Sequence, residues 1–200
     1  WQWPAGHKLT WTVRPDIRVA GFTANDLKEI FKQTWDLWDK ISGISIQHVN
    51  SPSDANILIL SRPIDGPFSI LAEAELPPPG IPKTAQLRLW LDEGERWVNA
   101  LNAPPQAIDV FRVALHEGGH NLGLGHQTDP TIPAIMAPAI SSLRSLQSWD
   151  VNQVQLRYGI EKPADPIPSP DGDEFAEILE QLAKCLKALS PSSKTTVREL

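Results

Sequence analysis

Three histidines and a glutamate gathered in one short segment have the clearest chemical potential in this chain. The segment runs His-Glu-Gly-Gly-His-Asn-Leu-Gly-Leu-Gly-His and begins at His116. His116 and His120 are four residues apart, so on a helix both imidazoles share one face and can bind one metal ion. Gly123 lets the backbone leave the helix through a conformation that other residues disfavour, which can bring His126 round as a third ligand. Three neutral imidazoles would leave a tetrahedral zinc ion with one open position for water, beside Glu117.

This pattern has a less specific interpretation, because H-E-x-x-H alone also occurs by chance in ordinary helices. The following glycine and third histidine favour the metal site, since a helix that only packs in a core needs neither. Gly118 and Gly119 would each cost about 1 kcal/mol relative to Ala inside a helix. We therefore expect something to approach the surface of this helix closely.

The elements that must position these residues can be read from apolar periodicity and capping signals. The helix that carries the motif is predicted at about residues 105–122. Thr23 and Asp26 form a capping-box pattern that opens an earlier helix, closed by Gly43. Its apolar stripe is Leu27, Ile30, Phe31, Leu37, Trp38 and Ile41. Strands are predicted at about 8–13, 44–49, 56–61 and 86–91, and a last helix from Ser148 to Tyr158, ended by Gly159.

A second motif follows the histidines and leads to a family resemblance. The segment Ala-Ile-Met-Ala-Pro at residues 134–138 holds the only methionine, Met136. The long histidine motif followed by a methionine turn resembles the metzincins. Flanking segments resemble the matrixin branch, the matrix-metalloprotease-like enzymes, over about residues 3–160; they are residues 64–67, 70–72, 92–97, 111–115 and 150–159. The resemblance implies an α/β fold of the zincin type: a twisted five-stranded, mostly parallel sheet with one antiparallel edge strand, packed on two long helices, with a C-terminal helix below the active-site cleft.

The resemblance also implies a secreted, extracellular zinc endopeptidase that acts on protein or peptide substrates. A zinc-bound water would attack the peptide carbonyl, with Glu117 as general base and then acid. Met136 would form a floor under the histidines, which is physically almost the same as being a core methionine, and Gly123 would serve the turn. Two rival functions remain: a metzincin relative with narrow exopeptidase or peptide-processing activity, and a silent domain that binds protein partners. The intact Glu117 and His126 argue against silence.

Substrate contacts are likewise implied by the resemblance rather than by spacing. They are Leu71, Ala72 and Ala74 on an edge segment that pairs with an extended peptide, Pro138 and Ile140 on the opposite wall, and Arg112. Ile140 departs from the tyrosine usual in matrixins. Arg112 occupies a position that in matrixins can line the floor of the main specificity pocket, and its alternative is a solvated helix face.

The sequence departs from the family pattern at a second, structural zinc site. Glu73 stands where the edge segment normally carries a histidine, and no histidine lies between His48 and His116. His7 and His48 are isolated and are interpreted as ordinary surface or strand residues. We therefore predict one catalytic zinc ion and no structural zinc.

Three carboxylates match the family's calcium ligands, namely Asp65, Asp92 and Glu95. Hard oxygen donors suit calcium, so the resemblance implies a calcium site. The alternative is that these residues are plain surface acids.

Composition limits the remaining possibilities. The chain has 200 residues, 41% hydrophobic and 21% charged, with a net charge of −6; this balance fits a globular domain and argues against nucleic-acid or anionic membrane partners. No apolar run approaches the ~18 residues that span a bilayer. The opening Trp1 suggests a processed or trimmed form, and the single Cys185 excludes an internal disulfide and a cysteine-based zinc site.

The sequence predicts three parts along the chain. Residues 1–160 form the matrixin-like catalytic domain, residues 161–172 a proline-rich linker, and residues 173–200 an amphipathic helical tail. The tail helix could pack back on the domain or dock on a partner, and the sequence leaves both open.

Overall fold

The fold is taken from a computed structural model that describes residues 1–139 and 142–160. Ile140 and the predicted linker and tail lie outside the described residues. The strands are β1 (Lys8–Val13), β2 (Ser45–His48), β3 (Ile57–Arg62), β4 (Ala72–Ala74), β5 (Leu87–Asp92), β6 (Trp97–Val98) and β7 (Ile108–Asp109). The helices are α1 (Ala24–Ile41), the short 3₁₀ turn η1 (Pro52–Asp54), α2 (Val110–Asn121) and α3 (Ser148–Tyr158).

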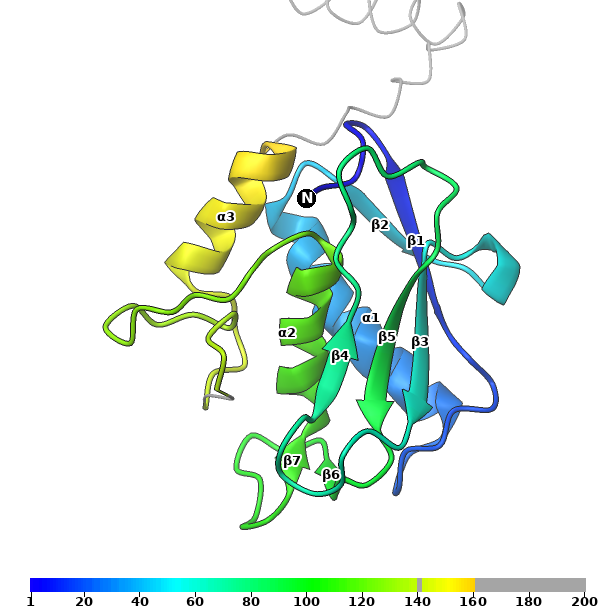
Figure 1. The fold of residues 1–200 in the computed structure, drawn as a ribbon, viewed down its shortest axis with the longest axis vertical. Coiled ribbons are helices and arrows are strands. Elements are labelled where there is room, and N and C mark those ends of the chain that lie inside the picture. Colours follow the sequence, from blue (N-terminus) through cyan, green and yellow to red (C-terminus); the bar gives the residue numbers. More distant parts are fainter. Residues whose placement is uncertain (140–141, 161–200) are drawn as a thin grey trace, which may run out of the picture. The chain divides into compact units, whose positions relative to one another are not determined.

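The main sheet has five strands in the order β2-β1-β3-β5-β4. Neighbouring strands run parallel except at the end of the sheet, where β4 pairs with β5 in the antiparallel sense. The predicted mostly parallel sheet with one antiparallel edge strand is therefore confirmed. A separate pair of short parallel strands, β6 and β7, lies next to the start of α2 (Figure 1).

Helices α1 and α2 pack against each other and against the sheet, and this contact forms much of the core (Figure 1). The predicted capping box opens α1: the Thr23 hydroxyl accepts the Asp26 N–H, and the Asp26 carboxylate accepts the Thr23 N–H. Leu27, Ile30, Phe31 and Trp38 are buried as the apolar stripe predicts, and Trp35 joins them. Trp38 also crosses to the second helix, where its indole N–H donates to the Leu115 carbonyl at 3.0 Å.

Helix α2 is shorter than the sequence suggested. It begins at Val110 rather than near residue 105, because Asp109 is its N-cap and accepts the Phe111 N–H. The preceding residues Ile108–Asp109 form β7 instead. At the other end of the domain, α3 matches the predicted range Ser148–Tyr158 and closes on Gly159, whose φ is 73°.

Candidate active site

The three histidines of the motif converge on one point. His116 and His120 project from the same face of α2, and His126 returns to them from the loop beyond the helix. The Nε2 atom of His126 lies 3.2 Å from that of His116 and 3.1 Å from that of His120. Four-coordinate zinc with Zn–N bonds of about 2.0–2.1 Å places its ligand nitrogens roughly 3.3 Å apart, so this spacing fits a zinc ion.

Hydrogen bonds on the far side of two imidazole rings fix the nitrogen that is offered to a metal. Nδ1 of His116 lies 2.8 Å from the Ile135 carbonyl, and Nδ1 of His120 lies 2.8 Å from the Leu124 carbonyl. A carbonyl oxygen only accepts, so each Nδ1 carries the proton and each Nε2 keeps a free lone pair. Burial lowers the pKa of His116 to about 4 and also lowers the pKa of His120. Both rings are therefore held neutral, the form that binds a metal.

Other groups of the protein lie very close to the glycines of the motif, as the sequence predicted. A side chain at Gly119 would bring its Cβ within 2.3 Å of the Met136 sulfur and 3.1 Å of the Trp38 ring. Gly123 has φ of +88°, and a Cβ there would lie 2.2 Å from the Trp1 carbonyl oxygen. The helix thus lies directly on the buried Met136, and the turn toward His126 has no space for a larger residue.

A buried carboxylate holds the methionine turn, and sequence reasoning did not single it out. Asp150, fully buried near the start of α3, accepts the backbone N–H groups of Ile135 at 2.9 Å and Met136 at 3.1 Å. The same turn supplies the Ile135 carbonyl that orients His116. Asp150 therefore acts on the histidine site through one intervening residue. Only its place near the start of a helix was visible in the sequence, and that gives no hint of burial.

Glu117 lies beside the histidines on the wall of the cleft, with 7% of its surface exposed. Burial raises its pKa to about 8, and the negative charge of Glu73 adds to the effect. A bound cation would oppose this shift, because a nearby positive charge favours the ionised carboxylate. A carboxyl group at this position is suited to exchange protons with a molecule that lies over the histidines.

The histidines open into a cleft of about 950 Å³ between strand β4 and the segment after the methionine turn. Leu71, Ala72, Ala74 and Pro138 all line this cleft, and their contact with substrate stays a prediction. β4 is the last strand of the sheet and pairs only with β5 within it, so its outer edge has backbone groups to offer an extended peptide. Ile140, the remaining predicted contact, is outside the described residues.

Arg112 lines the same cleft and is not on a solvated helix face. Its side chain is 13% exposed, and its Nε lies 3.1 Å from the fully buried carboxylate of Asp109. A second arginine, Arg144, approaches the same oxygen of Asp109 at 3.2 Å and lies over the Phe111 ring. Arg144 follows Leu143, which lines the cleft. One buried carboxylate thus joins the start of α2 to the segment around Leu143, and neither Asp109 nor Arg144 was predicted.

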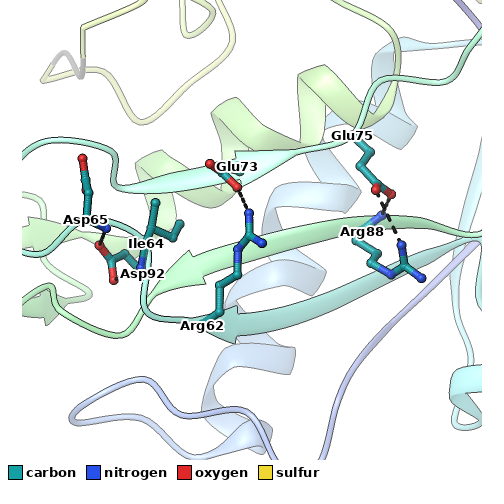
Figure 2. Close-up of polar contacts among 7 residues, drawn as sticks. All are labelled: Arg62, Ile64, Asp65, Glu73, Glu75, Arg88 and Asp92. Carbon is teal, nitrogen blue, oxygen red and sulfur yellow. Dashed lines mark hydrogen bonds and ion pairs between the residues drawn. The ribbon is translucent and has the colours of Figure 1, made fainter.

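The three predicted calcium ligands surround the loop that precedes β4. Asp92 accepts the N–H groups of Ile64 at 3.1 Å and Asp65 at 3.4 Å (Figure 2). It also accepts those of Gly66 at 3.2 Å and Gly94 at 2.8 Å. Loss of hydration acts to raise the Asp92 pKa, but these hydrogen bonds lower it overall. Glu95 accepts the Phe68 N–H with one oxygen, while its Oε2 is buried without a partner. Asp92 and Glu95 are buried, so they are not plain surface acids, and they organise this loop whether or not calcium binds.

Glu73 is paired with an arginine in the structure. Figure 2 shows the Arg62–Glu73 ion pair joining the end of β3 to β4 across β5. The guanidinium also lies 4.5 Å from the Trp90 ring centroid, within cation–π range. Among the described residues, His116, His120 and His126 are the one group whose ligand atoms converge. The interpretation of His7 needs correction, because it is buried, stacks on Trp3 and contacts the Asn56 amide oxygen at 3.0 Å.

Three convergent imidazoles, a buried glutamate and a free strand edge define a zinc-type metalloprotease site, and the comparisons with known proteins agree. The sequence model of the matrixin family matches residues 2–159. The chain is 32% identical over 163 residues to matrix metalloproteinase-16 of Homo sapiens, which covers 72% of this chain. It is 30% identical over 197 residues to interstitial collagenase of Sus scrofa, and 32% over 175 residues to metalloendoproteinase 1 of Glycine max, covering 94% and 80% of this chain. The chain belongs to the matrixin family.

The matches cover only part of each relative: 25% of matrix metalloproteinase-16, 38% of interstitial collagenase and 53% of metalloendoproteinase 1. Family membership supports a zinc metalloendopeptidase in general terms. Family membership does not by itself identify the substrates of this chain. No helix within the described residues has the length and apolar character needed to cross a membrane.

Proposed function

We propose that this domain is a zinc-dependent endopeptidase that hydrolyses peptide bonds with Glu117 as general base and acid. The observation that carries the proposal is the convergence of three histidine Nε2 atoms beside Glu117 in an open cleft. His116, His120 and His126 would hold the zinc, which when bound supplies a Lewis acid for the peptide carbonyl and lowers the pKa of water. Secretion, as inferred from the family, stays a prediction.

We infer the roles of the protein groups in this reaction from their positions in the cleft. The free edge of β4 would bind the substrate as an added strand, which places a peptide bond over the histidines. Glu117 would take a proton from the attacking water and pass it to the leaving amine. The hydrogen bonds from Nδ1 of His116 and His120 to backbone carbonyls would keep both rings in place during turnover. No covalent bond between enzyme and substrate is required.

Metal content and cleavage measured on the same samples would test this function. We expect one zinc ion per chain by elemental analysis, and cleavage of denatured casein or gelatin that a zinc chelator abolishes and added zinc restores. The matched controls are His126→Ala, which removes a ligand, and His48→Ala, which should change neither zinc nor activity. Casein cleavage that survives full removal of zinc would refute the function, and two tightly held zinc ions would refute the predicted stoichiometry.

We further propose that Arg112 shapes the pocket for the residue just after the scissile bond. Its guanidinium is held by Asp109 and by the Leu101 carbonyl, so it should close the floor of the pocket to long side chains. Arg112→Ala should admit larger aromatic residues, with selectivity changed about 10–200-fold per methylene-scale difference in fit. Peptide-library profiles of the two proteins provide the measurement. If wild type and Arg112→Ala prefer the same residues just after the scissile bond, the depth of the pocket is set by the segment around Leu143 and not by Arg112.

Calcium is a further proposal for Asp65, Asp92 and Glu95. Support comes from the buried, unpartnered Oε2 of Glu95, whose pKa is raised by burial and, to a smaller extent, by the negative charges of Asp92 and Asp65. A cation that binds only the folded state stabilises it, by about 2.7 kcal/mol at one hundred times its Kd. Melting temperature should therefore rise with calcium after chelation, and Asp65→Asn should reduce the response. Asp92→Ala is unsuitable as a variant because it would also release four backbone N–H groups. A melting temperature of the chelated protein that calcium does not change would contradict the site.

A further inference from the structure

The end of helix α2 lies next to the convergent histidines, and its last carbonyl groups need hydrogen-bond partners. The helix ends at Asn121, one residue after His120, and the chain then turns to bring His126 back. The last carbonyls of a helix have no partner within it, and a buried carbonyl without a hydrogen bond is costly. The N–H groups of the turn satisfy the carbonyls up to that of His120. Those of Asn121 and Leu122 therefore depend on groups from elsewhere.

Two aromatic side chains from distant parts of the chain supply these partners. The Trp3 indole N–H donates to the Asn121 carbonyl at 2.9 Å, and the Tyr158 hydroxyl donates to the Leu122 carbonyl at 2.8 Å. The same hydroxyl accepts the backbone N–H of Trp3 at 3.1 Å. Burial raises the pKa of Tyr158 to about 12, so the hydroxyl keeps the proton that it donates. Trp3 and Tyr158 thus form one connected unit, the aromatic cap, at the C-terminal end of α2.

The aromatic cap is itself held in place by other parts of the domain. The Trp3 side chain is fully buried and stacks on the ring of His7, with the two centroids 5.2 Å apart. Nε2 of His7 lies 3.0 Å from the Asn56 amide oxygen, which fixes that ring in turn. Tyr158 is the last residue of α3, and the start of the chain meets the ends of α2 and α3 at one end of the domain (Figure 1). The position of the cap is therefore set independently of the turn that it contacts.

The turn under the cap orients two of the three histidines. The Leu124 carbonyl accepts the Nδ1 proton of His120 at 2.8 Å, and the chain reaches His126 two residues later. A displacement of the Asn121 and Leu122 carbonyls would move Leu124 and, with it, the Nε2 atoms of both histidines. Supporting contacts of this kind are important in metal sites, where the loss of one typically costs about 10–100-fold in metal affinity or activity.

We propose that Trp3 and Tyr158 are positioning residues of the histidine site, because their hydrogen bonds to the end of α2 hold the turn that brings His120 and His126 to a zinc ion. The inference rests on the proposed zinc binding and extends it to two residues that do not line the cleft. Their effect would pass entirely through the backbone of the turn. Zinc affinity and ligand geometry should therefore depend on them even though neither touches the substrate.

Zinc affinity of conservative variants tests this role. Tyr158→Phe removes only the hydroxyl, and Trp3→Phe removes the indole N–H while it keeps an aromatic ring beside His7. We expect each variant to bind zinc about tenfold more weakly than wild type in competition with a chromophoric zinc chelator, since one lost buried hydrogen bond corresponds to about that factor. The matched control is Trp97→Phe, because the Trp97 indole makes a similar buried hydrogen bond to the Asp92 carbonyl at 2.8 Å. It should lower the melting temperature and leave the zinc affinity unchanged.

The visible absorption of cobalt-substituted protein reports the ligand geometry separately from stability. We expect the cobalt bands to shift in Tyr158→Phe and Trp3→Phe and to stay unchanged in Trp97→Phe, all recorded at a temperature at which every variant is folded. If both cap variants melted at a lower temperature but kept the wild-type zinc affinity and cobalt spectrum, the two aromatic residues would serve packing alone. That result would overturn the proposal.

Amide hydrogen exchange of the metal-free protein decides the matter whatever the chain binds. The N–H groups of Leu122, Gly123 and Leu124 are hydrogen-bonded in the turn, and we expect them to exchange about tenfold faster in both cap variants. Wild-type exchange rates at these three amides would overturn the positioning role. By contrast, a wild type that binds zinc but cleaves no peptide would refute the peptidase function and leave this inference standing.

Discussion

Replacing Glu117 with Gln is expected to lower kcat by about 10²–10⁴-fold, the usual contribution of a positioned general base. Gln has nearly the same shape but cannot take a proton from water. Glu117 is 7% exposed and lies on the cleft wall next to the convergent histidines His116 and His120. The zinc content and the melting temperature should remain close to the wild-type values. The substitution leaves His116 and His120 in place, together with their hydrogen bonds to the Ile135 and Leu124 carbonyls.

The matched control is Glu73→Gln, which alters another acid on the same cleft. Glu73 is half-buried and paired with the exposed Arg62, so its loss should affect the rate by no more than a few-fold. Steady-state cleavage of one peptide at saturating substrate, with metal content measured on each sample, gives the comparison. If Glu117→Gln turned over substrate at a near-normal rate with one zinc bound, Glu117 would not be the base.

Replacing Asp109 with Ala is expected to destabilise the domain by about 3–5 kcal/mol, the usual effect of removing one partner from a buried ion pair. Asp109 is fully buried and faces Arg112, 13% exposed, and Arg144, 23% exposed. Loss of hydration raises the pKa of Asp109 despite these two arginines. Without the carboxylate, two partly buried guanidinium groups would lack a counter-ion and would keep only neutral acceptors, the Leu101 carbonyl for Arg112 and the Asn99 amide oxygen for Arg144. The loss of the α2 N-cap adds about 1 kcal/mol.

Urea unfolding of the two proteins measures this change, and Asp16→Ala provides its control. Asp16 forms an ion pair with Arg14, but both side chains are well exposed, so the change in unfolding free energy should stay below about 1 kcal/mol. Asp109→Asn is also informative, since an amide oxygen can still cap the helix while the charge is lost. An Asp109→Ala variant within 1 kcal/mol of wild type would mean that water replaces the carboxylate. Arg112 and Arg144 would then not depend on it for their positions.

The histidine motif and the order of the long helices and strands could be predicted from the sequence alone. Spacing on a helix is a local property, so His116 and His120 could be placed on one face without knowledge of the fold. The same holds for the capping box of Thr23 and Asp26 and for the positive φ of Gly123, which depend on nearby backbone geometry. Apolar patterns placed β1, β2, β3 and β5 within about one residue, since burial of one face repeats along each element, but they did not indicate the two-residue strands β6 and β7.

The tertiary structure decided which distant residues meet at the site, because contacts between elements leave no regular spacing in the sequence. Asp150 reaches the methionine turn from α3, and Arg144 reaches Asp109 from beyond the cleft. The start of α2 was predicted about five residues early, since the buried N-cap at Asp109 is set by its tertiary partners. Likewise, neither the pairing of Glu73 with Arg62 across β5 nor the hydrogen bond from the Phe68 N–H to the buried Glu95 could be read from residue types. These features depend on how the sheet edge and its loop fold against one another, and that arrangement exists only in three dimensions.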